Sequence, residues 1–418
     1  MHPEDILAAI TTKLETIGIT GVIDPDQVRK PAIDSRERRA LAELEDELQR
    51  VMESVKNDAR LPNLLTKLAN LHFKEADLPR AILLYEVTLG MDSKQVDAWI
   101  NMGTAYLVAG EPKDAISCMS SALAVSPNNI HALVTLGMAQ LEVGDYDNCI
   151  LNIELALRQD SAFDKALVGK GLYLARKGDW AGAIAWFNNA LKANPNSLKA
   201  LTELGKAYLS VGQYENAIEI LQKATDIDRE QPYALASLGD AFYARREYDR
   251  ALYYYDKAAE VKPDDTSLWI RKGDAHRILK SYTEAATAYE RAINANPENA
   301  EAWSRCGQVL LLLSEPSAAL EYFNTAVTLA PTNPTIAHQR GLLNLSLGKL
   351  EEALTDFDIA FSVEPNNPVH LYQRGLILEK LRRTAEAKRT WQIAMSLFKQ
   401  NGDRARAAEC SARMKRLA

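Results

Sequence analysis

The residues with catalytic or metal-binding chemistry are scattered along this sequence. The patterns H-E-x-x-H, G-x-x-x-x-G-K-[ST], G-x-S-x-G and G-x-G-x-x-G are all absent. Histidines and cysteines are also dispersed, and no two cysteines have C-x-x-C spacing. They are His2, His72, His131, His276, His338, His370, Cys118, Cys149, Cys306 and Cys410. We therefore predict no enzyme active site, no metal site and no cofactor, with the cysteines packed as small apolar residues.

The composition is that of an ordinary folded protein. Apolar residues make up 47% of the chain and charged residues 25%, and the net charge of −7 argues against a nucleic-acid partner. The N-terminus lacks the basic and apolar regions of a signal peptide, and no apolar stretch approaches the ~18 residues of a membrane span. Scattered cysteines indicate a reducing compartment. We therefore expect a cytoplasmic protein without a membrane partner.

Nine glycines recur at a fixed interval of 34 residues. They are Gly103, Gly137, Gly171, Gly205, Gly239, Gly273, Gly307, Gly341 and Gly375. A period of this length is typical of a stack of identical supersecondary units. Glycine inside a helix costs about 1 kcal/mol relative to alanine. We expect that a second helix crosses each glycine so closely that a Cβ would clash.

The period defines ten units, which begin at residues 62, 96, 130, 164, 198, 232, 266, 300, 334 and 368. Glycine stands at position 8 and alanine at positions 20 and 27, each in nine of the ten units, with a large apolar residue at position 24 and often proline at position 32. Positions 4, 7, 8 and 11 share one side of a helix, and positions 20, 24 and 27 share one side of another. Each unit is therefore predicted to be a hairpin of helix A and helix B.

Four units carry a basic residue at position 7, which is apolar in the others. We expect the alkyl stems of these residues to pack while their charges reach water. They are Lys170, Lys272, Arg340 and Arg374.

Residues outside the ten units are predicted to form helices at both ends. Pro3 to Ile17 has the apolar spacing of a short amphipathic helix, and Asp24–Gln27 has the form of a helix start. A longer helix follows Asp34, with Leu41, Leu44, Leu48, Val51 and Val55 at alternating spacings of three and four. This helix would either cover the first unit or mediate self-association. A basic helix after Asp403, with Ala405, Ala408 and Ala412 on one side, would cap the other end or bind an acidic partner.

The pattern W-x-x-L-G-x-x-Y … A-x-x-x-F-x-x-A … P resembles that of the tetratricopeptide repeat. One unit matches it with Trp99, Met102, Gly103, Tyr106, Ala115, Met119, Ala122 and Pro127, and another with Trp303, Cys306, Gly307, Ala319, Phe323, Ala326 and Pro331. The resemblance implies an all-α, right-handed superhelical α-solenoid. It would comprise a non-repeat segment 1–61, ten repeats over 62–401 and a capping helix over 402–418.

The resemblance also implies that helix-A residues at positions 2, 5, 6, 9, 12 and 13 face a concave groove that binds protein partners. Repeats six to eight place tyrosines, arginines and acids at these positions, which would hold an acidic peptide. The candidates are Tyr233, Asp240, Tyr243, Arg271, Asp274, Arg277, Glu301, Arg305 and Gln308. Alternatively, the acids pair with the arginines across repeats on a solvated wall.

The first four repeats offer weaker candidates. Of the residues at the family's carboxylate-clamp positions, only Asn70 and Asn101 match, so chaperone-tail binding is not expected, but both remain candidate partner contacts. A more apolar set would either accept an amphipathic helix or be the normal apolar share of a surface. It comprises Ile100, Val108, Val134, Met138, Val168 and Leu172.

These features together predict a non-enzymatic scaffold or adaptor that binds a peptide or partner helix in the groove. The alternative is a regulatory or targeting subunit of an enzyme complex. An acidic protein or peptide is the expected ligand, and self-association would use residues 1–61.

Overall fold

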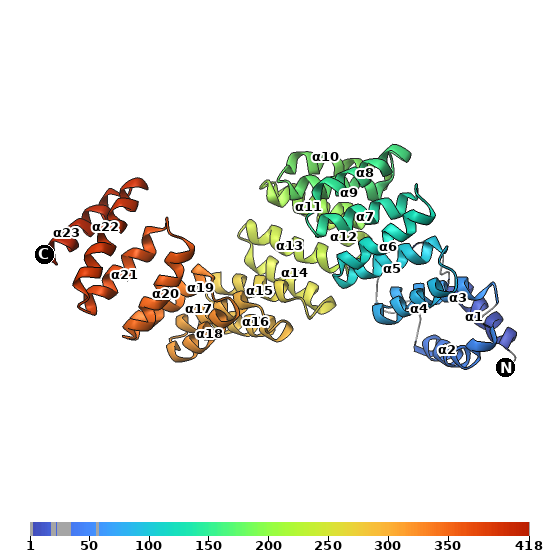
Figure 1. Cartoon of the computed structure of the whole chain (residues 1–418), viewed down its shortest axis with the longest axis horizontal. Coiled ribbons are helices and arrows are strands. Elements are labelled where there is room, and N and C mark those ends of the chain that lie inside the picture. The colour runs from blue at the N-terminus through green and yellow to red at the C-terminus, as the bar shows by residue number, and fades with distance from the viewer. Residues whose placement is uncertain (1–2, 18–21, 23–34, 56–57, 418) are drawn as a thin grey trace. The chain divides into compact units, whose positions relative to one another are not determined.

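The protein is all-helical in the computed structural model, which describes residues 3–17, 22, 35–55 and 58–417, apart from some side chains of the first two helices. The chain divides into two compact units, Met1–Arg229 and Glu230–Ala418 (Figure 1). Within each unit the helices pack mainly against their neighbours in the chain. This confirms the predicted succession of hairpins.

The first unit contains two leading helices and five hairpins. The leading helices are α1 (Pro3–Ile17) and α2 (Ser35–Val55). The A helices are α3 (Leu61–Lys74), α5 (Val96–Ala109), α7 (Ile130–Glu142), α9 (Asp164–Arg176) and α11 (Leu198–Ser210). The B helices are α4 (Leu78–Met91), α6 (Pro112–Val125), α8 (Tyr146–Gln159), α10 (Trp180–Ala193) and α12 (Tyr214–Ile227).

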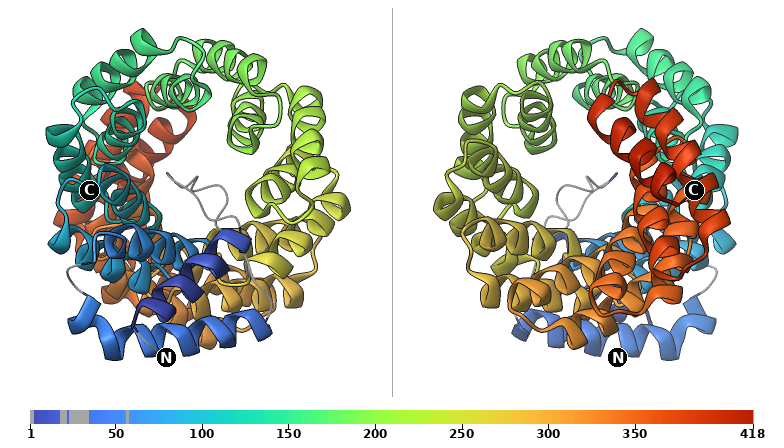
Figure 2. Two further views of the ribbon diagram at one scale, coloured as in Figure 1. Left: turned by 90° about the vertical axis from the view of Figure 1, so that its right-hand side faces the viewer. Right: turned by 90° about the vertical axis from the view of Figure 1, so that its left-hand side faces the viewer.

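The second unit contains five more hairpins and a final helix. The A helices are α13 (Pro232–Ala244), α15 (Thr266–Ile278), α17 (Ala300–Leu312), α19 (Pro334–Ser346) and α21 (Pro368–Lys380). The B helices are α14 (Tyr248–Val261), α16 (Tyr282–Ala295), α18 (Pro316–Leu329), α20 (Leu350–Val363) and α22 (Thr384–Gln400). The final helix is α23 (Arg404–Arg416), which packs on α22 at the C-terminal end (Figure 2).

The periodic glycines lie where the two helices of a hairpin cross. A Cβ built on Gly239 would lie 2.3 Å from the ring of Tyr255, the position-24 residue of the same repeat. On Gly103 the nearest atom would be Cε of Met119, at 2.4 Å. The expected reason for the glycine period is therefore confirmed.

The turn between helix A and helix B requires a left-handed residue at position 15. Glycine supplies it in some repeats, for example Gly110 with φ 82°. Five other repeats use a non-glycine residue, such as Lys280 with φ 62°, in a region that L-amino acids disfavour. The helical hairpin is thus maintained even where its turn residue is strained.

The basic residues at position 7 do not simply extend into water. Lys170 pairs with Glu154 at 3.0 Å, and Arg374 pairs with Asp358, in both cases on helix B of the preceding repeat. Arg340 instead forms an ion pair with Asp356 of its own repeat, whose side chain is fully buried. The expectation that these charges are solvated is corrected, because adjacent B helices place acids within their reach.

The N-terminal helix over Pro3–Ile17 forms as predicted, and α1, α2 and α3 share one apolar cluster. Leu48 and Val55 of α2 are buried in it, and Nε2 of His72 on α3 lies 3.2 Å from Glu45 Oε1 on α2. Association with the first repeat therefore uses part of the predicted seam of α2. Asp24–Gln27 and Asp34 lie outside the described residues, as do the side chains of Leu41, Leu44 and Val51.

The C-terminal helix α23 packs through a different side from the one that its alanines indicate. Ala407 and Cys410 are buried, with Met414 and Leu417 against the same cluster. Ala405, Ala408 and Ala412 are exposed. The prediction that Ala405, Ala408 and Ala412 form the apolar side of the helix is wrong. Residues 407, 410, 414 and 417 form the packed side instead, because they include the larger apolar side chains.

Candidate functional site

The predicted site on the A helices is built around two aspartates at position 9. Asp240 on α13 accepts a hydrogen bond from the Tyr255 hydroxyl on α14 through Oδ1, at 2.8 Å. Its Oδ2 accepts another from Nη1 of Arg271 on α15, also at 2.8 Å. Burial, followed by the Asp240 charge, raises the pKa of Tyr255, so this hydroxyl remains a donor. One carboxylate therefore links its own B helix to the next A helix.

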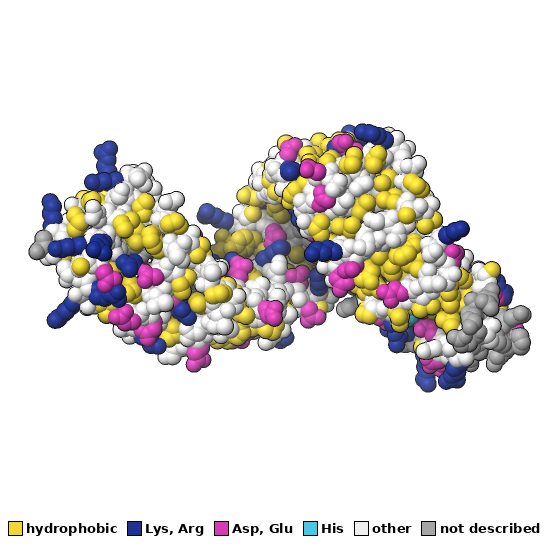
Figure 3. All heavy atoms as spheres, in the orientation of Figure 1, with side chains coloured by type: hydrophobic (Ala, Val, Ile, Leu, Met, Phe, Trp, Pro, Cys, Tyr) yellow, Lys and Arg dark blue, Asp and Glu magenta, His cyan; other side chains and the backbone are white. Residues whose placement is uncertain are grey.

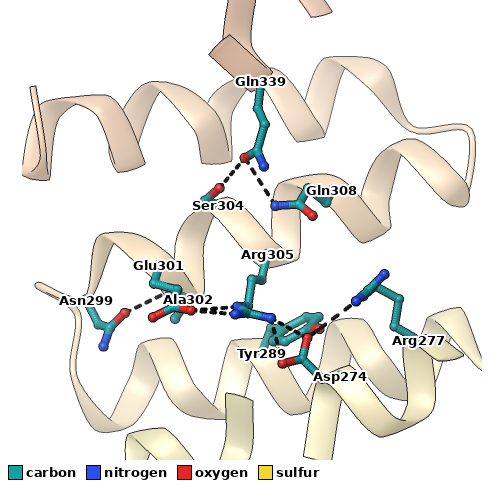
Figure 4. A network of polar contacts seen from close by, with 10 residues as sticks. All are labelled: Asp274, Arg277, Tyr289, Asn299, Glu301, Ala302, Ser304, Arg305, Gln308 and Gln339. Carbon is teal, nitrogen blue, oxygen red and sulfur yellow. Dashed lines mark hydrogen bonds and ion pairs between the residues drawn. The ribbon is translucent and has the colours of Figure 1, made fainter. Parts of the chain in front are cut away.

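Asp274 repeats this geometry one repeat later (Figure 4). It accepts from the Tyr289 hydroxyl at 2.7 Å and from Nη1 of Arg305 on α17 at 2.5 and 2.6 Å. Arg305 also donates to Oε1 of Glu301 at 2.6 Å, and Arg277 lies 3.8 Å from Asp274. The tyrosine, aspartate and arginine thus form a brace across three helices.

A neutral version of the brace occurs in the first unit. Oδ1 of Asn70 on α3 accepts from the Tyr85 hydroxyl on α4 at 2.6 Å and from Nδ2 of Asn101 on α5 at 2.9 Å. The same three repeat positions are used in each case. Both asparagines are buried, at 1% and 0% exposure. The expectation that they contact a partner is corrected, because they connect repeats inside the protein.

The braces bear directly on the predicted acidic-peptide site. Arg271 and Arg305 each already pair with a carboxylate of the preceding repeat, which is the alternative that the sequence left open. Their side chains nevertheless remain 41% and 31% exposed. The arginines therefore belong to a polar surface whose charges are largely matched, and an acidic ligand would compete with Asp240 and Asp274.

The remaining candidates of the second unit are less closely connected. Tyr233 lies beside Lys262, whose Nζ is 3.3 Å from the tyrosine hydroxyl. Tyr243 packs edge-on against Tyr248, and burial raises its pKa. Gln308 donates to Oε1 of Gln339 on α19 at 3.1 Å, as Figure 4 shows. Gln339 thus continues the chain of bonds from α17 to α19.

Four exposed apolar residues that the sequence prediction missed lie on the A helices α15, α17 and α19. Leu312 is 50% exposed, Leu342 41%, Ile278 38% and Leu311 36%. We call these four residues the apolar A face. The bonds from Arg305 to Asp274 and from Gln308 to Gln339 link α15 to α17 and α17 to α19, the helices that carry these four residues. Apolar residues at positions 9, 12 and 13 of successive repeats were the signal available in the sequence.

The apolar set predicted in the first unit does not form such a surface. Ile100, Val134 and Val168 are buried, at 0%, 6% and 6% exposure. Of the six candidates, only Val108 is strongly exposed, at 43%. The prediction of a groove from these residues is corrected, because position 5 faces the protein interior.

Two features are absent from the described ranges, a metal-binding cluster and a membrane-spanning helix. No three histidine, cysteine or acidic side chains there are grouped to hold a metal ion. No described helix combines the length and apolar character needed to cross a bilayer. All four cysteines are free and buried, and burial raises the pKa of Cys118 to about 12.

Comparison with known protein families identifies the class of this helical array. Models of the tetratricopeptide repeat match residues 134–197 and 270–334, 174–241, and 234–268. The chain belongs to the tetratricopeptide repeat family, with ten tandem 34-residue repeats. Proteins of this family generally act as non-catalytic scaffolds that bind protein or peptide partners. A comparison with curated proteins found no match.

Solved structures of other repeat proteins are similar to this chain. The Cut9–Hcn1 hetero-tetramer of APC/C matches with a TM-score of 0.56 and 18% identity, over 72% of this chain and 59% of that chain. The present chain thus spans less than two thirds of that relative, and the likeness concerns the fold alone. YrrB, described as having an unusual peptide-binding site, gives 0.40 and 25%, over 47% and 99%. MamA gives 0.36 and 28%, over 38% and 93%.

Proposed function

We propose that this protein is a non-enzymatic scaffold that binds a peptide or partner helix on the apolar A face. The family supports protein binding in general. The observation that carries the specific proposal is the exposure of Leu311, Leu312 and Leu342 on adjacent A helices. Single scattered apolar residues are normal on a protein surface, and we infer that this group on consecutive A helices forms a patch of the kind that is typical of an interaction site.

The polar braces complete this binding face. The bond from Arg305 to Asp274 links α17 to α15, and the bond from Gln308 to Gln339 links α17 to α19, so both place hydrogen-bonding groups on the helices that carry the leucines. An amphipathic segment would place its apolar side on Leu312 and Leu342 and its polar edge along the braces. This ligand suits the charge-matched arginines better than a purely acidic peptide, because it does not require Asp240 or Asp274 to give up a partner.

The test is affinity purification of the full chain from its source cells, with quantitative recovery of each partner. The Leu312→Asp/Leu342→Asp variant should lose the principal partner, because it places charge in the apolar contact. Leu83→Asp/Leu151→Asp is the matched control, since both leucines are exposed on B helices of the first unit. Equal recovery by wild type and the Leu312/Leu342 variant would refute the proposal.

A further variant separates the two kinds of ligand. Arg271→Glu/Arg305→Glu should reduce partner recovery more than the leucine variant only if an acidic peptide is the main ligand. A catalytic subunit recovered in fixed ratio would instead assign the chain to the regulatory or targeting role.

A further inference from the structure

The last helices of the chain carry a charge opposite to that of the remainder. Residues 379–418 contain 11 lysines and arginines but only four acids. The chain as a whole has 49 basic and 56 acidic residues, so the first 378 residues are strongly acidic. Figure 3 shows basic side chains gathered over the C-terminal end, in the region of α21 to α23.

All four acids of this segment already have partners. Glu379 accepts from Trp391 Nε1 and pairs with Arg413, and Glu409 accepts from the Tyr372 hydroxyl and from Arg413. The other two acids engage Arg383 and Arg406: the pairs are Glu386–Arg383 and Asp403–Arg406. The local acids therefore neutralise only three of the arginines.

Eight basic residues remain. Lys399 and Arg404 lie beside the link between α22 and α23, and we call the other six the basic patch. They are Lys380, Arg382, Lys388, Arg389, Lys415 and Arg416. Within the described part of the chain, none of these side chains has an ion pair or hydrogen bond. Five are exposed and Lys388 is partly exposed. This differs from the repeats, where Arg271, Arg305 and Arg374 each reach an acid of the preceding repeat.

The fold brings the six residues of the basic patch to one end of the helix pair α22 and α23. Helices α22 and α23 are joined by a link of three residues and pack along each other, so they run antiparallel. The contact between Arg413 and Glu379 places the last turn of α23 beside the last turn of α21. Lys415 and Arg416 therefore lie at the same end as Lys380 and Arg382.

Helix termini explain only part of this arrangement. Lys380, Lys415 and Arg416 stand in the last turns of α21 and α23, where cations suit the helix dipole. Arg382 lies in the turn between helices, and Lys388 and Arg389 lie in the second turn of α22. Positive charge thus accumulates beyond what the helix ends require.

We propose that the basic patch docks an acidic segment of a partner protein. Large exposed apolar residues other than Ile393 are absent from the described part of α22 and α23, which leaves little to insert into a membrane. Exposed aromatic rings are likewise absent there, so the patch lacks a stacking platform for nucleic-acid bases. The carboxylates of an acidic protein segment pair with arginine and lysine, and this pairing requires neither exposed apolar residues nor exposed aromatic rings. This surface is separate from the apolar A face and does not depend on it.

The test uses the full chain and a short fluorescent peptide of alternating glutamate and serine, followed by fluorescence anisotropy. The glutamate peptide should bind, with an affinity that falls as salt rises to about 0.15 M, whereas a glutamine–serine peptide should not. Arg389→Glu/Lys415→Glu/Arg416→Glu should weaken binding by about tenfold or more. Lys94→Glu/Lys113→Glu/Lys192→Glu makes the same charge change on the first unit and should leave the affinity within about twofold.

Several results would overturn the proposal. Absence of binding by the glutamate peptide at low salt would do so, as would equal losses in both triple variants. Tighter binding of an oligonucleotide, or of anionic phospholipid vesicles, than of a peptide with matched charge would assign the patch to another class of partner. Circular dichroism of each variant ensures that a loss of binding is not a loss of helix.

Discussion

Arg305 on α17 donates from a single nitrogen, Nη1, to both carboxylate oxygens of Asp274 on α15, at 2.5 and 2.6 Å. The two residues are 31 positions apart, so this contact joins consecutive repeats. Asp274 is only 17% exposed and also accepts from Tyr289. An ion pair in this position is shielded from water more than most surface pairs, and it fixes the spacing of two A helices.

Loss of this brace should loosen the interface between repeats seven and eight. Arg305→Ala and Asp274→Ala should each destabilise by about 1–2 kcal/mol, with a coupling of about 0.5–1.5 kcal/mol in the double variant. Hydrogen exchange of amides in α15 and α17 measures the local effect. Strict additivity of the two variants would mean that the contact contributes nothing of its own.

The glycines at position 8 should differ in their tolerance of a methyl group. Gly239→Ala would place Cβ 2.3 Å from the buried ring of Tyr255, so we expect a loss of about 1–3 kcal/mol from overpacking. Gly307→Ala would meet its nearest neighbours at 3.2–3.3 Å, and the gain in helix propensity of about 1 kcal/mol should offset most of its strain. Thermal unfolding of the two variants makes the comparison, and equal losses would contradict it.

The buried pair of Arg340 and Asp356 should be sensitive to removal of one partner. Asp356 is fully buried and also accepts from Asn344 Nδ2 at 2.9 Å, so Arg340→Met would leave a carboxylate in the interior without its cation. We expect a loss of about 3–5 kcal/mol, seen as a lower urea midpoint. Arg374→Met is the control and should cost less, because its partner Asp358 is half exposed. Restored stability in Arg340→Met/Asp356→Leu would confirm the cause.

His338 should make the second unit sensitive to acid. His338 Nδ1 lies 3.1 Å from His370 Nδ1, and His370 Nε2 lies 3.0 Å from Glu364. Burial, followed by the charge of His370, lowers the pKa of His338, although Glu364 opposes this. The folded state therefore favours neutral His338, so its contribution is complete above the unfolded pKa of about 6.5 and declines as the pH falls below that value.

Measurement of the urea midpoint at neutral pH and near pH 5.5 tests this expectation. The His338→Gln variant should lose less stability over that interval than wild type. An unchanged pH dependence would exclude His338 as the source. Glu364 is expected to act only at lower pH, because its bond with His370 lowers its carboxyl pKa.

Much of the fold was predictable from the sequence because the residue spacings that specify each helical hairpin lie within a single repeat. The glycine and alanine spacing identifies two helix sides per repeat, and the first amphipathic segment forms the helix Pro3–Ile17 as expected. The polar candidates were harder to assign. Arg271 and Asp240 could be recognised as neighbours in adjacent repeats, but the spacing allowed either an ion pair or two ligand contacts.

The sequence by itself determined the hairpin, its 34-residue period and the need for small side chains where helices cross, since these follow from helical geometry. Only the tertiary structure decided which polar and apolar residues reach solvent. Asn70 and Asn101 became buried links, while Leu312 and Leu342 remained exposed. Their environments depend on residues 15 or more positions away, which become neighbours only when helices pack, so exposure is a property of the assembled repeats.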